Sequence, residues 1–350
     1  MRHGDDSLAR GATLESAARL AAPQALRYER EPAPLRWQVA EPDGDYAGDF
    51  LLPGEQPWAH RHLEAAEARH WSPAEVTLAR DAEAWATLAP EARAVFQHGL
   101  HLLALLDRVL SREGPTQAAW RLVESADCRR LLDRQAWDEG QRAGACRRIA
   151  AALALTAEDA GPLPEACAHA ARIGDWLATQ AALLGDAAGG ITDAGTARNL
   201  AAALGACLVA AKATLVPLVS IQGLCIARHG RLEGSARLFR HLLRDEMAHL
   251  QFGLSLLRAI RETAPRWWDP QLEATLRGGL VMAADLAIGQ AYATLPRGLP
   301  GLNAPMLEEY LLFAANRCCR ALGLAELQPD AANPFFWIAE LRPPRGTGKP

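Results

Sequence analysis

The sequence lacks the cysteine patterns of a disulfide-bonded or zinc-binding protein. It contains seven cysteines among 350 residues, an odd number, and no two of them form a Cys-x-x-Cys pair. Scattered thiols at irregular spacing are typical of proteins from a reducing compartment. We therefore expect free cysteines and a cytoplasmic protein.

Long hydrophobic runs are also missing. Runs such as Leu102–Leu106 are far shorter than the roughly 20 apolar residues that cross a bilayer. The first ten residues are charged and have no apolar core, so we expect no signal peptide. A net charge of −4 and a pI of about 6.2 give no electrostatic basis for binding nucleic acid. Neither a membrane nor nucleic acid is an expected partner.

Clusters of β-branched residues and hairpin turns are missing too, and no repeat of 20–50 residues is evident. The sequence is instead rich in alanine and leucine, with apolar residues at helical spacing. Ser72 and Pro73 are expected to begin a helix, and Pro90 to begin one that runs to about Arg112. Further long helices are expected at residues 129–155, 163–184, 194–228, 232–262, 268–294 and 304–322.

These patterns predict an all-α fold, a single bundle of about eight long helices. The bundle is expected to cover residues 56–340. Residues 1–55 contain several prolines and glycines without clean periodicity, so we expect a partly irregular N-terminal arm. Residues 341–350 are expected to form a short disordered tail.

Glu246 and His249 form the most informative pair in the chain. Because they are three residues apart, their side chains share one face of a helix. A Glu-x-x-His pair within a long helix is the repeating ligand unit of di-iron and di-manganese bundle proteins. The pattern is short, however, and an exposed glutamate beside a hydrogen-bonded histidine would produce it equally well.

The surroundings of this pair resemble the small subunit of class I ribonucleotide reductase, a ferritin-like family. The elements that carry the resemblance are Trp71-Ser72-Pro73-Ala74-Glu75-Val76, Leu105-Leu106-Asp107, Gln135-Ala136-Trp137-Asp138-Glu139, Leu232-Glu233-Gly234, Arg244-Asp245-Glu246-Met247-Ala248-His249, Gly301-Leu302-Asn303 and Asn333-Pro334-Phe335-Phe336-Trp337. They follow the family's order along the chain. The resemblance implies a ferritin-like helical bundle, an oxidoreductase of deoxyribonucleotide biosynthesis and a homodimeric β subunit.

The resemblance also implies a site for two metal ions, held by four carboxylates and two histidines. The positions of this sequence that match are Asp107, Glu139, Glu246 and His249. Arg142 stands where the family has its other histidine, and Lys212 stands where it has a glutamate. Two of the six implied ligands are therefore replaced by cations.

These two cations change what the site can hold. Arginine and protonated lysine have no lone pair to offer a metal, whereas buried carboxylates need counter-charges. We therefore expect no cofactor in the di-metal site, with Arg142 and Lys212 neutralising the carboxylates. The alternative is that both cations turn outward and one iron or manganese ion remains bound to the four retained ligands.

Three further positions concern the radical chemistry that the resemblance implies. The family's radical tyrosine falls at Cys146, and none of the four tyrosines lies in that helix. Trp71 and Asp245 look like the inner pair of the family's radical relay. The alternative for Trp71 is a core residue, and for Cys146 a packing residue. The basic tail Arg342–Pro350 differs from the acidic, aromatic tail by which the family docks on its large subunit.

Three functions remain open, and the sequence leaves open whether the protein is an enzyme. The first is an accessory or degenerate β subunit that pairs with itself or with a small-subunit paralogue, without the family's mode of docking on a large subunit. The second is a ferritin-like oxidase or oxygenase of a specialised pathway that uses a mononuclear metal. The third is a functional, radical-generating β subunit of ribonucleoside-diphosphate reductase.

Overall fold

The computed structural model describes residues 56–110, 115–155, 163–186 and 194–340. The expected arm at residues 1–55 and the expected tail at residues 341–350 lie outside these ranges, as does most of the glycine-rich break before residue 194. The described residues contain helices and no strand, apart from an isolated bridge between Leu299 and Leu302. The all-α prediction is confirmed.

Among the described residues, nine helices of 11 residues or more form the bundle. They are α2 (Pro57–Glu67), α4 (Pro90–Leu110), α6 (Ala126–Ala152), α7 (Pro164–Asp186), α8 (Ala194–Leu204), α9 (Ala211–His229), α10 (Glu233–Thr263), α11 (Pro270–Thr294) and α12 (Ala304–Leu322), of which α8 continues into α9 through the π-helical segment η3 (Gly205–Ala210). Shorter elements are η1 (Pro73–Glu75), α3 (Asp81–Ala86), α5 (Pro115–Leu122), η4 (Pro265–Trp267) and α13 (Trp337–Glu340).

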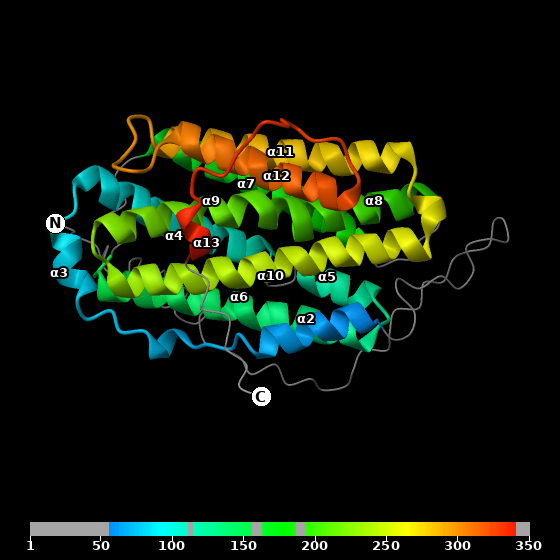
Figure 1. The fold of residues 1–350 in the computed structure, drawn as a ribbon, viewed down its shortest axis with the longest axis horizontal. Helices are drawn as coiled ribbons and strands as arrows, with labels where there is room; N and C mark the ends of the chain where they lie inside the picture. The colour runs from blue at the N-terminus through cyan, green and yellow to red at the C-terminus, as the bar shows by residue number, and fades with distance from the viewer. Residues whose placement is uncertain (1–55, 111–114, 156–162, 187–193, 341–350) are drawn as a thin grey trace, which may run out of the picture. The chain divides into compact units, whose positions relative to one another are not determined.

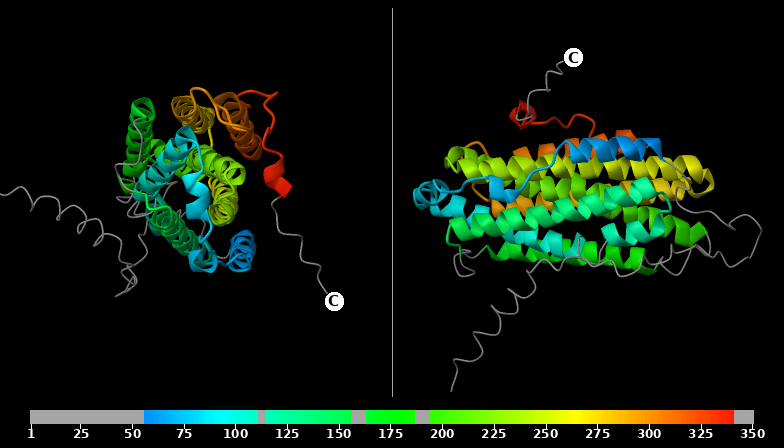
Figure 2. Two further views of the ribbon diagram at one scale, coloured as in Figure 1. Left: turned by 90° about the vertical axis from the view of Figure 1, so that its left-hand side faces the viewer. Right: turned by 90° about the horizontal axis from the view of Figure 1, so that it is seen from below.

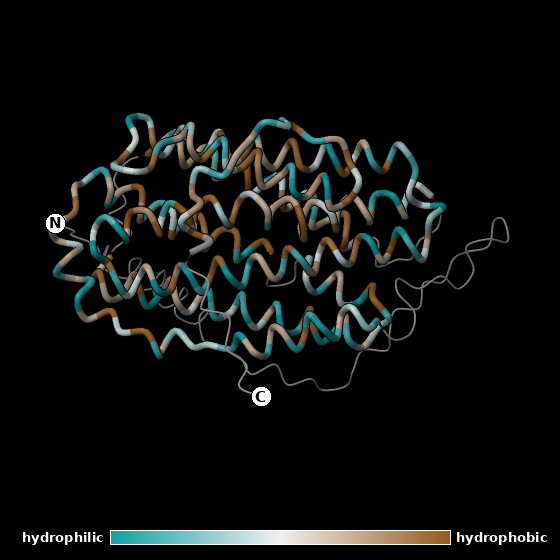
Figure 3. The backbone as a smooth tube through the Cα atoms, in the orientation of Figure 1, coloured by the Kyte–Doolittle hydropathy of each residue, from teal (hydrophilic) through white to brown (hydrophobic). Residues whose placement is uncertain are grey.

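Helix α9 is the centre of the bundle. It contacts α4, α10, α11 and α12, and every residue from Ala211 to Ala227 is buried. Helix α6 packs on α4 and α2, and α7 packs on α4 and α11 (Figures 1 and 2). Hydrophobic residues predominate along α9, whereas hydrophilic residues recur along α6 (Figure 3). The apolar positions of the surrounding helices therefore face one shared core.

The stretch Gly195–His229 is long and apolar enough to cross a membrane by length and composition alone. All of its most apolar window is buried inside the bundle, as expected of the core helix of a folded domain. Counting uninterrupted apolar runs missed this stretch, because Lys212, Thr214 and Pro217 interrupt it. One such helix, covered on all sides, gives no support for a membrane-spanning segment.

Several helices begin with a side-chain cap. Asp269 and Asn303 cap α11 and α12 by accepting hydrogen bonds from the backbone N–H groups of Leu272 and Met306. The helix expected from Ser72 is wrong in extent. Ser72 caps only the 3₁₀ turn η1, because the chain becomes extended at Val76.

Candidate functional site

Four helices bring the six positions implied by the ligand pattern into one buried cluster. Asp107 comes from α4, Glu139 and Arg142 from α6, Lys212 from α9, and Glu246 and His249 from α10. The least buried of these residues, Asp107, is 8% exposed and Lys212 is fully buried. We call these six residues the charge cluster.

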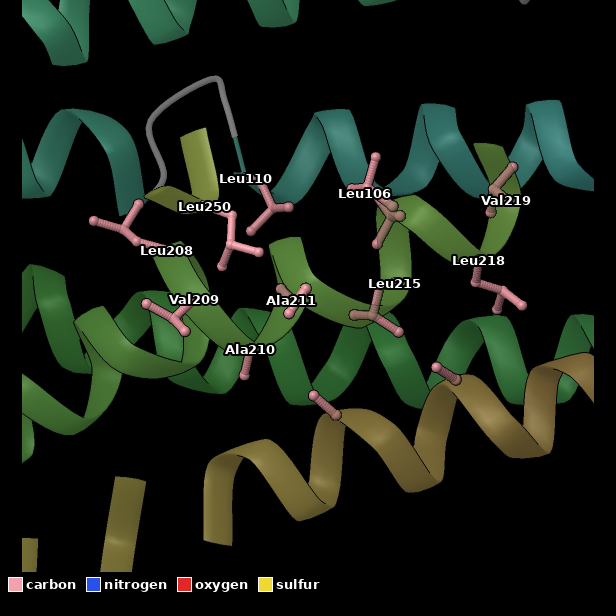
Figure 4. Close-up of a cluster of buried hydrophobic side chains, with 14 of the residues drawn as sticks. Leu106, Leu110, Leu208, Val209, Ala210, Ala211, Leu215, Leu218, Val219 and Leu250 are labelled. Carbon is pink, nitrogen blue, oxygen red and sulfur yellow. The ribbon is translucent and has the colours of Figure 1, made fainter. Parts of the chain in front are cut away.

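Helical spacing explains how each helix contributes. Glu139 and Arg142 are three residues apart on α6, as Glu246 and His249 are on α10, so each pair shares a face. Lys212 lies two residues after the end of η3, where the π-helical turn shifts the register of the helix. Figure 4 shows Leu208, Leu215 and other core side chains gathered in an apolar cluster along the same stretch of the chain.

Arg142 links two of the carboxylates. Its Nε donates to Oδ1 of Asp107 at 2.5 Å, and its Nη1 donates to Oε2 of Glu246 at 2.9 Å. The planar guanidinium therefore lies between α4 and α10 and donates hydrogen bonds to a carboxylate on each of these two helices.

Lys212 links the remaining carboxylate to the same centre. Its Nζ donates to Oε1 of Glu139 at 3.0 Å and to Oε1 of Glu246 at 3.3 Å. Glu246 is therefore shared, with one oxygen bound to Arg142 and the other to Lys212. Both cationic side chains point into the cluster rather than outward.

The electrostatic effects within the cluster favour the charged forms. Burial alone would lower the pKa of Lys212, but the carboxylates of Glu246 and Glu139 outweigh it and raise that pKa. The pKa of Arg142 is raised in the same way by Asp107 and Glu246. Burial would raise the pKa of Glu246, yet Lys212 and Arg142 hold it well below its usual range. Each charge is thus stabilised by charges from other helices.

Asp107 behaves differently from Glu246. Burial raises its pKa, and the opposing effect of Arg142 does not cancel the effect of burial. Arg142 is its partner in the cluster, whereas Glu246 has two cationic partners. The ionised form of Asp107 is therefore less favoured than that of Glu246.

His249 is held by a residue that the sequence analysis did not single out. Its Nε2 lies 3.1 Å from Oδ2 of Asp138, and Asp138 is itself bound to Arg134 at 2.9 Å. The other ring nitrogen lies 3.4 Å from Glu246 without hydrogen-bond geometry. Burial would lower the pKa of His249, but Asp138 and Glu246 raise it. Asp138 directly precedes Glu139, and only the tertiary structure reveals its contact 111 residues away.

Gln135 is a second unexpected contributor. Its Nε2 donates to Oε1 of Glu139 and to the hydroxyl of Thr116, both at 3.3 Å. The other oxygen of Glu139 is buried and has no hydrogen-bond partner among the described residues. The hydrogen bonds that Glu139 accepts from Lys212 and Gln135 therefore both end on the same carboxylate oxygen, Oε1.

The arrangement does not fit two metal ions. Each of the three carboxylates of the cluster already binds the head group of Arg142 or Lys212. In the part of the chain that the structure describes, no three His, Cys, Asp or Glu side chains are placed to hold a metal ion. Because cationic head groups repel divalent ions, the donors could accept two ions only after both cations moved.

The positions associated with radical transfer lie beside the cluster. Trp71 donates from Nε1 to Oδ2 of Asp245 at 2.6 Å, and its ring stacks on His241 with 4.5 Å between centroids. Arg142 directs its bonds to Asp107 and Glu246, and none of them joins it to Asp245.

Cys146 lies one turn beyond Arg142 on α6. Burial raises the pKa of its thiol to about 12, so the thiol stays protonated at neutral pH. A buried, protonated thiol among apolar side chains packs as a small hydrophobic residue.

Comparisons with known proteins identify the family to which the chain is similar. The sequence model of the family described as ribonucleotide reductase, small chain, matches residues 50–334. The chain is similar to ribonucleoside-diphosphate reductase subunit beta from Chlamydia pneumoniae, with 27% identity over 299 residues, 83% of this chain and 84% of the relative.

Solved structures show the same fold. The ribonucleotide reductase R2 subunit from Clostridium botulinum has a TM-score of 0.70 and 20% identity, covering 82% of this chain and 88% of that one. Streptococcus sanguinis dimanganese(II)-NrdF has a TM-score of 0.65 and 17% identity, covering 82% and 95%. The predicted ferritin-like helical bundle is confirmed. Since the family match spans most of its length, the chain belongs to the small-chain family of ribonucleotide reductases.

Proposed function

We propose that this protein is an accessory, degenerate β subunit in which Arg142 and Lys212 replace two metal ions as counter-charges. The observation that carries the proposal is the position of Lys212 Nζ, fully buried between Glu139 and Glu246 at 3.0 and 3.3 Å. A buried ammonium group at a ligand position supplies the positive charge that these carboxylates need. The protein then contributes its fold and surfaces rather than a metal-based oxidant.

The energetics support this exchange. Opposite charges 4 Å apart attract by about 4 kcal/mol at an effective dielectric of about 20. A divalent ion at the same place would meet repulsion from both cations and would have to displace them. Three carboxylates against two fixed cations leave only one formal negative charge, apart from His249, so the cluster has little need for an added ion.

The position of the radical tyrosine supports the same proposal. It is occupied by Cys146, and Tyr292 and Tyr310 lie on α11 and α12 rather than on α6. Tyr28 and Tyr46 lie outside the described residues. Without a tyrosine at this position, we propose that the subunit generates no tyrosyl radical of the family's kind.

Two unpartnered atoms support the alternative function, an oxidase or oxygenase with one metal ion. One oxygen of Glu139 and Nδ1 of His249 are both buried without hydrogen-bond partners. If Lys212 withdrew, these atoms could join Glu246 in an oxygen-rich site for one iron or manganese ion. The third function, a radical-generating β subunit, requires both Lys212 and Arg142 to leave the cluster.

The partners and location are also part of this proposal, and the chain's membership of the ribonucleotide reductase small-chain family supports them. We propose a dimer with a second copy or with a small-subunit paralogue, in the cytoplasm. An accessory role in deoxyribonucleotide biosynthesis would place it beside a competent small subunit and its large subunit, without catalytic turnover of its own.

Elemental analysis combined with electron paramagnetic resonance tests the proposal. The protein is produced in medium rich in iron and manganese and purified in air. We expect far less than one equivalent of either metal per chain and no tyrosyl radical signal. About one tightly held equivalent would favour the oxidase function. Two equivalents with a radical signal would favour the radical-generating subunit and overturn the proposal.

A further inference from the structure

A groove outside the charge cluster concentrates positive charge that forms no ion pair among the described residues. It has a volume of about 910 Å³ and lies between the extended segment after η1, the end of α9, the first turns of α10 and Trp337 of α13. Figures 1 and 2 show α13 beside α9 and α10. Its volume is within the roughly 300–1,000 Å³ range of ligand pockets.

The base of the groove is apolar and its rim is basic. The buried apolar lining residues are Val76, Leu224, Ala227 and Ala236. The basic lining residues, all exposed, are Arg80, Arg228, Arg231, Arg237 and Arg240. Against these five arginines the lining holds only two carboxylates, which leaves a formal excess of three positive charges in a chain with a net charge of −4. We call this surface the arginine groove.

The carboxylates of the lining do not neutralise these arginines. Asp81 is buried and accepts hydrogen bonds from the backbone N–H groups of Gly234 and Ser235 at 3.0 and 2.7 Å, which caps the start of α10. Within the described residues, the side chains of Arg80, Arg231, Arg237 and Arg240 form no ion pair, and Arg228 lies over the ring of Trp337.

The positive charge of these arginines affects the pKa of a neighbouring histidine. His241 follows Arg240 on α10, and its pKa is lowered to about 4, first by burial and then by Arg244, Arg237 and Arg240. A histidine kept neutral partly by nearby arginines indicates positive potential on this face of the described residues. Surface arginines are normally offset by acids on the same face.

We propose that the arginine groove binds an acidic segment of a partner protein, with apolar side chains on its base and carboxylates on its arginines. Arginine pairs with carboxylates in a bidentate geometry, which gives such a contact both strength and direction. The inference holds whether or not the charge cluster binds metal.

The distribution of the arginines favours an extended ligand. Arg231 precedes α10 and Arg240 lies about two turns into it, so the row extends over roughly 10 Å at 1.5 Å per helical residue. A compact anion would contact only part of this row and none of the apolar base. A nucleic acid would meet long-range repulsion from the acidic chain and would leave the apolar base unused.

Fluorescence anisotropy with the full chain tests the proposal. The probe is a labelled peptide in which glutamate alternates with leucine and phenylalanine, and its control carries glutamine in place of glutamate. We expect the acidic peptide to bind and the glutamine peptide to bind at least tenfold more weakly. Added salt should weaken the acidic peptide's binding, because the contacts are ionic and exposed.

Matched charge-reversal variants locate the site. Arg237→Glu with Arg240→Glu should weaken peptide binding at least tenfold, which corresponds to about 1.4 kcal/mol. Arg172→Glu with Arg297→Glu makes the same change in net charge at two exposed arginines outside the groove and should change affinity less than twofold. Thermal unfolding of both variants should match that of the wild type, since all four side chains are exposed.

Several results would overturn the inference. These are no measurable peptide binding, equal losses in the two double variants, or equal binding of the glutamine peptide. Tighter, Arg237-dependent binding of tripolyphosphate or of a single-stranded oligonucleotide would also overturn it, by identifying a different class of ligand. Metal content is unaffected by these variants, so failure here is distinguishable from failure of the proposed function.

Discussion

Replacing Lys212 with methionine removes one charge from the centre of the cluster while keeping a long, flexible side chain. Glu246 keeps its bond to Arg142 at 2.9 Å, so it remains paired. Glu139 keeps only the neutral amide of Gln135 at 3.3 Å. The loss therefore falls mainly on Glu139, whose carboxylate becomes an uncompensated buried charge.

The expected destabilisation is about 3–5 kcal/mol, the typical cost of removing one partner of a buried ion pair. Because Lys212 is fully buried, solvent screening does not reduce this figure. The assay is urea unfolding followed by circular dichroism. The unfolding free energies of the variants are compared using one common slope of free energy against urea concentration. Leu215→Met is the matched control in the same helix and should cost less than about 1.5 kcal/mol.

Adding Glu139→Gln to Lys212→Met sharpens the test. The neutral amide needs no counter-charge, so the double variant should recover much of the stability that Lys212→Met loses. A single variant that unfolds within about 1 kcal/mol of the wild type would refute the reasoning. Equal stability of the single and double variants would show that Glu139 was not the stranded group.

Three further predictions concern the pH dependence of stability, the role of Asp138 and the oligomeric state. The contribution of Glu246, whose pKa is lowered, is present above the unfolded carboxyl pKa of about 4.3 and is lost as pH falls through its folded pKa. The contribution of Lys212, whose pKa is raised, is lost only as pH rises beyond its ordinary value, so the loss of stability caused by Lys212→Met should be about the same at pH 6 and at pH 9. Asp138→Asn should cost about 1–3 kcal/mol because it weakens the bonds to His249 and Arg134, whereas Asp175→Asn on the surface should be neutral, as urea unfolding would show. Sedimentation velocity at micromolar concentration should show a dimer, and a monomer would count against the proposed assembly.

The positions of the charge cluster were predictable mainly from the resemblance to the family, and helical spacing added which side chains share a face within one helix. Glu246 and His249 are three residues apart, and Lys212 lies on the preceding long helix at the spacing of a ligand. The inward direction of Lys212 was expected from its role as a counter-charge, with an outward turn as the alternative. The π-helical turn at Gly205–Ala210 was not predicted, because nothing in the composition of that stretch distinguishes it from ordinary helix.

Contacts between distant segments were harder to predict. The bond between Asp138 and His249 joins two helices through a residue that the ligand pattern treats as variable. The arginine groove combines residues from the segment after η1, from α9, from α10 and from α13, none of which forms a basic run in the sequence. Both features depend on tertiary packing, which local patterns do not encode.

Metal titration of the wild type and of a rebuilt site tests the central claim most directly. Arg142→His combined with Lys212→Glu restores the six-ligand pattern of the family on the same four helices. After anaerobic incubation with excess manganese(II) and then with iron(II), followed by dialysis, the account predicts far less than one equivalent in the wild type. It predicts close to two equivalents in the rebuilt variant. Two tightly bound equivalents in the wild type would contradict the claim that Arg142 and Lys212 act as counter-charges in place of the metals.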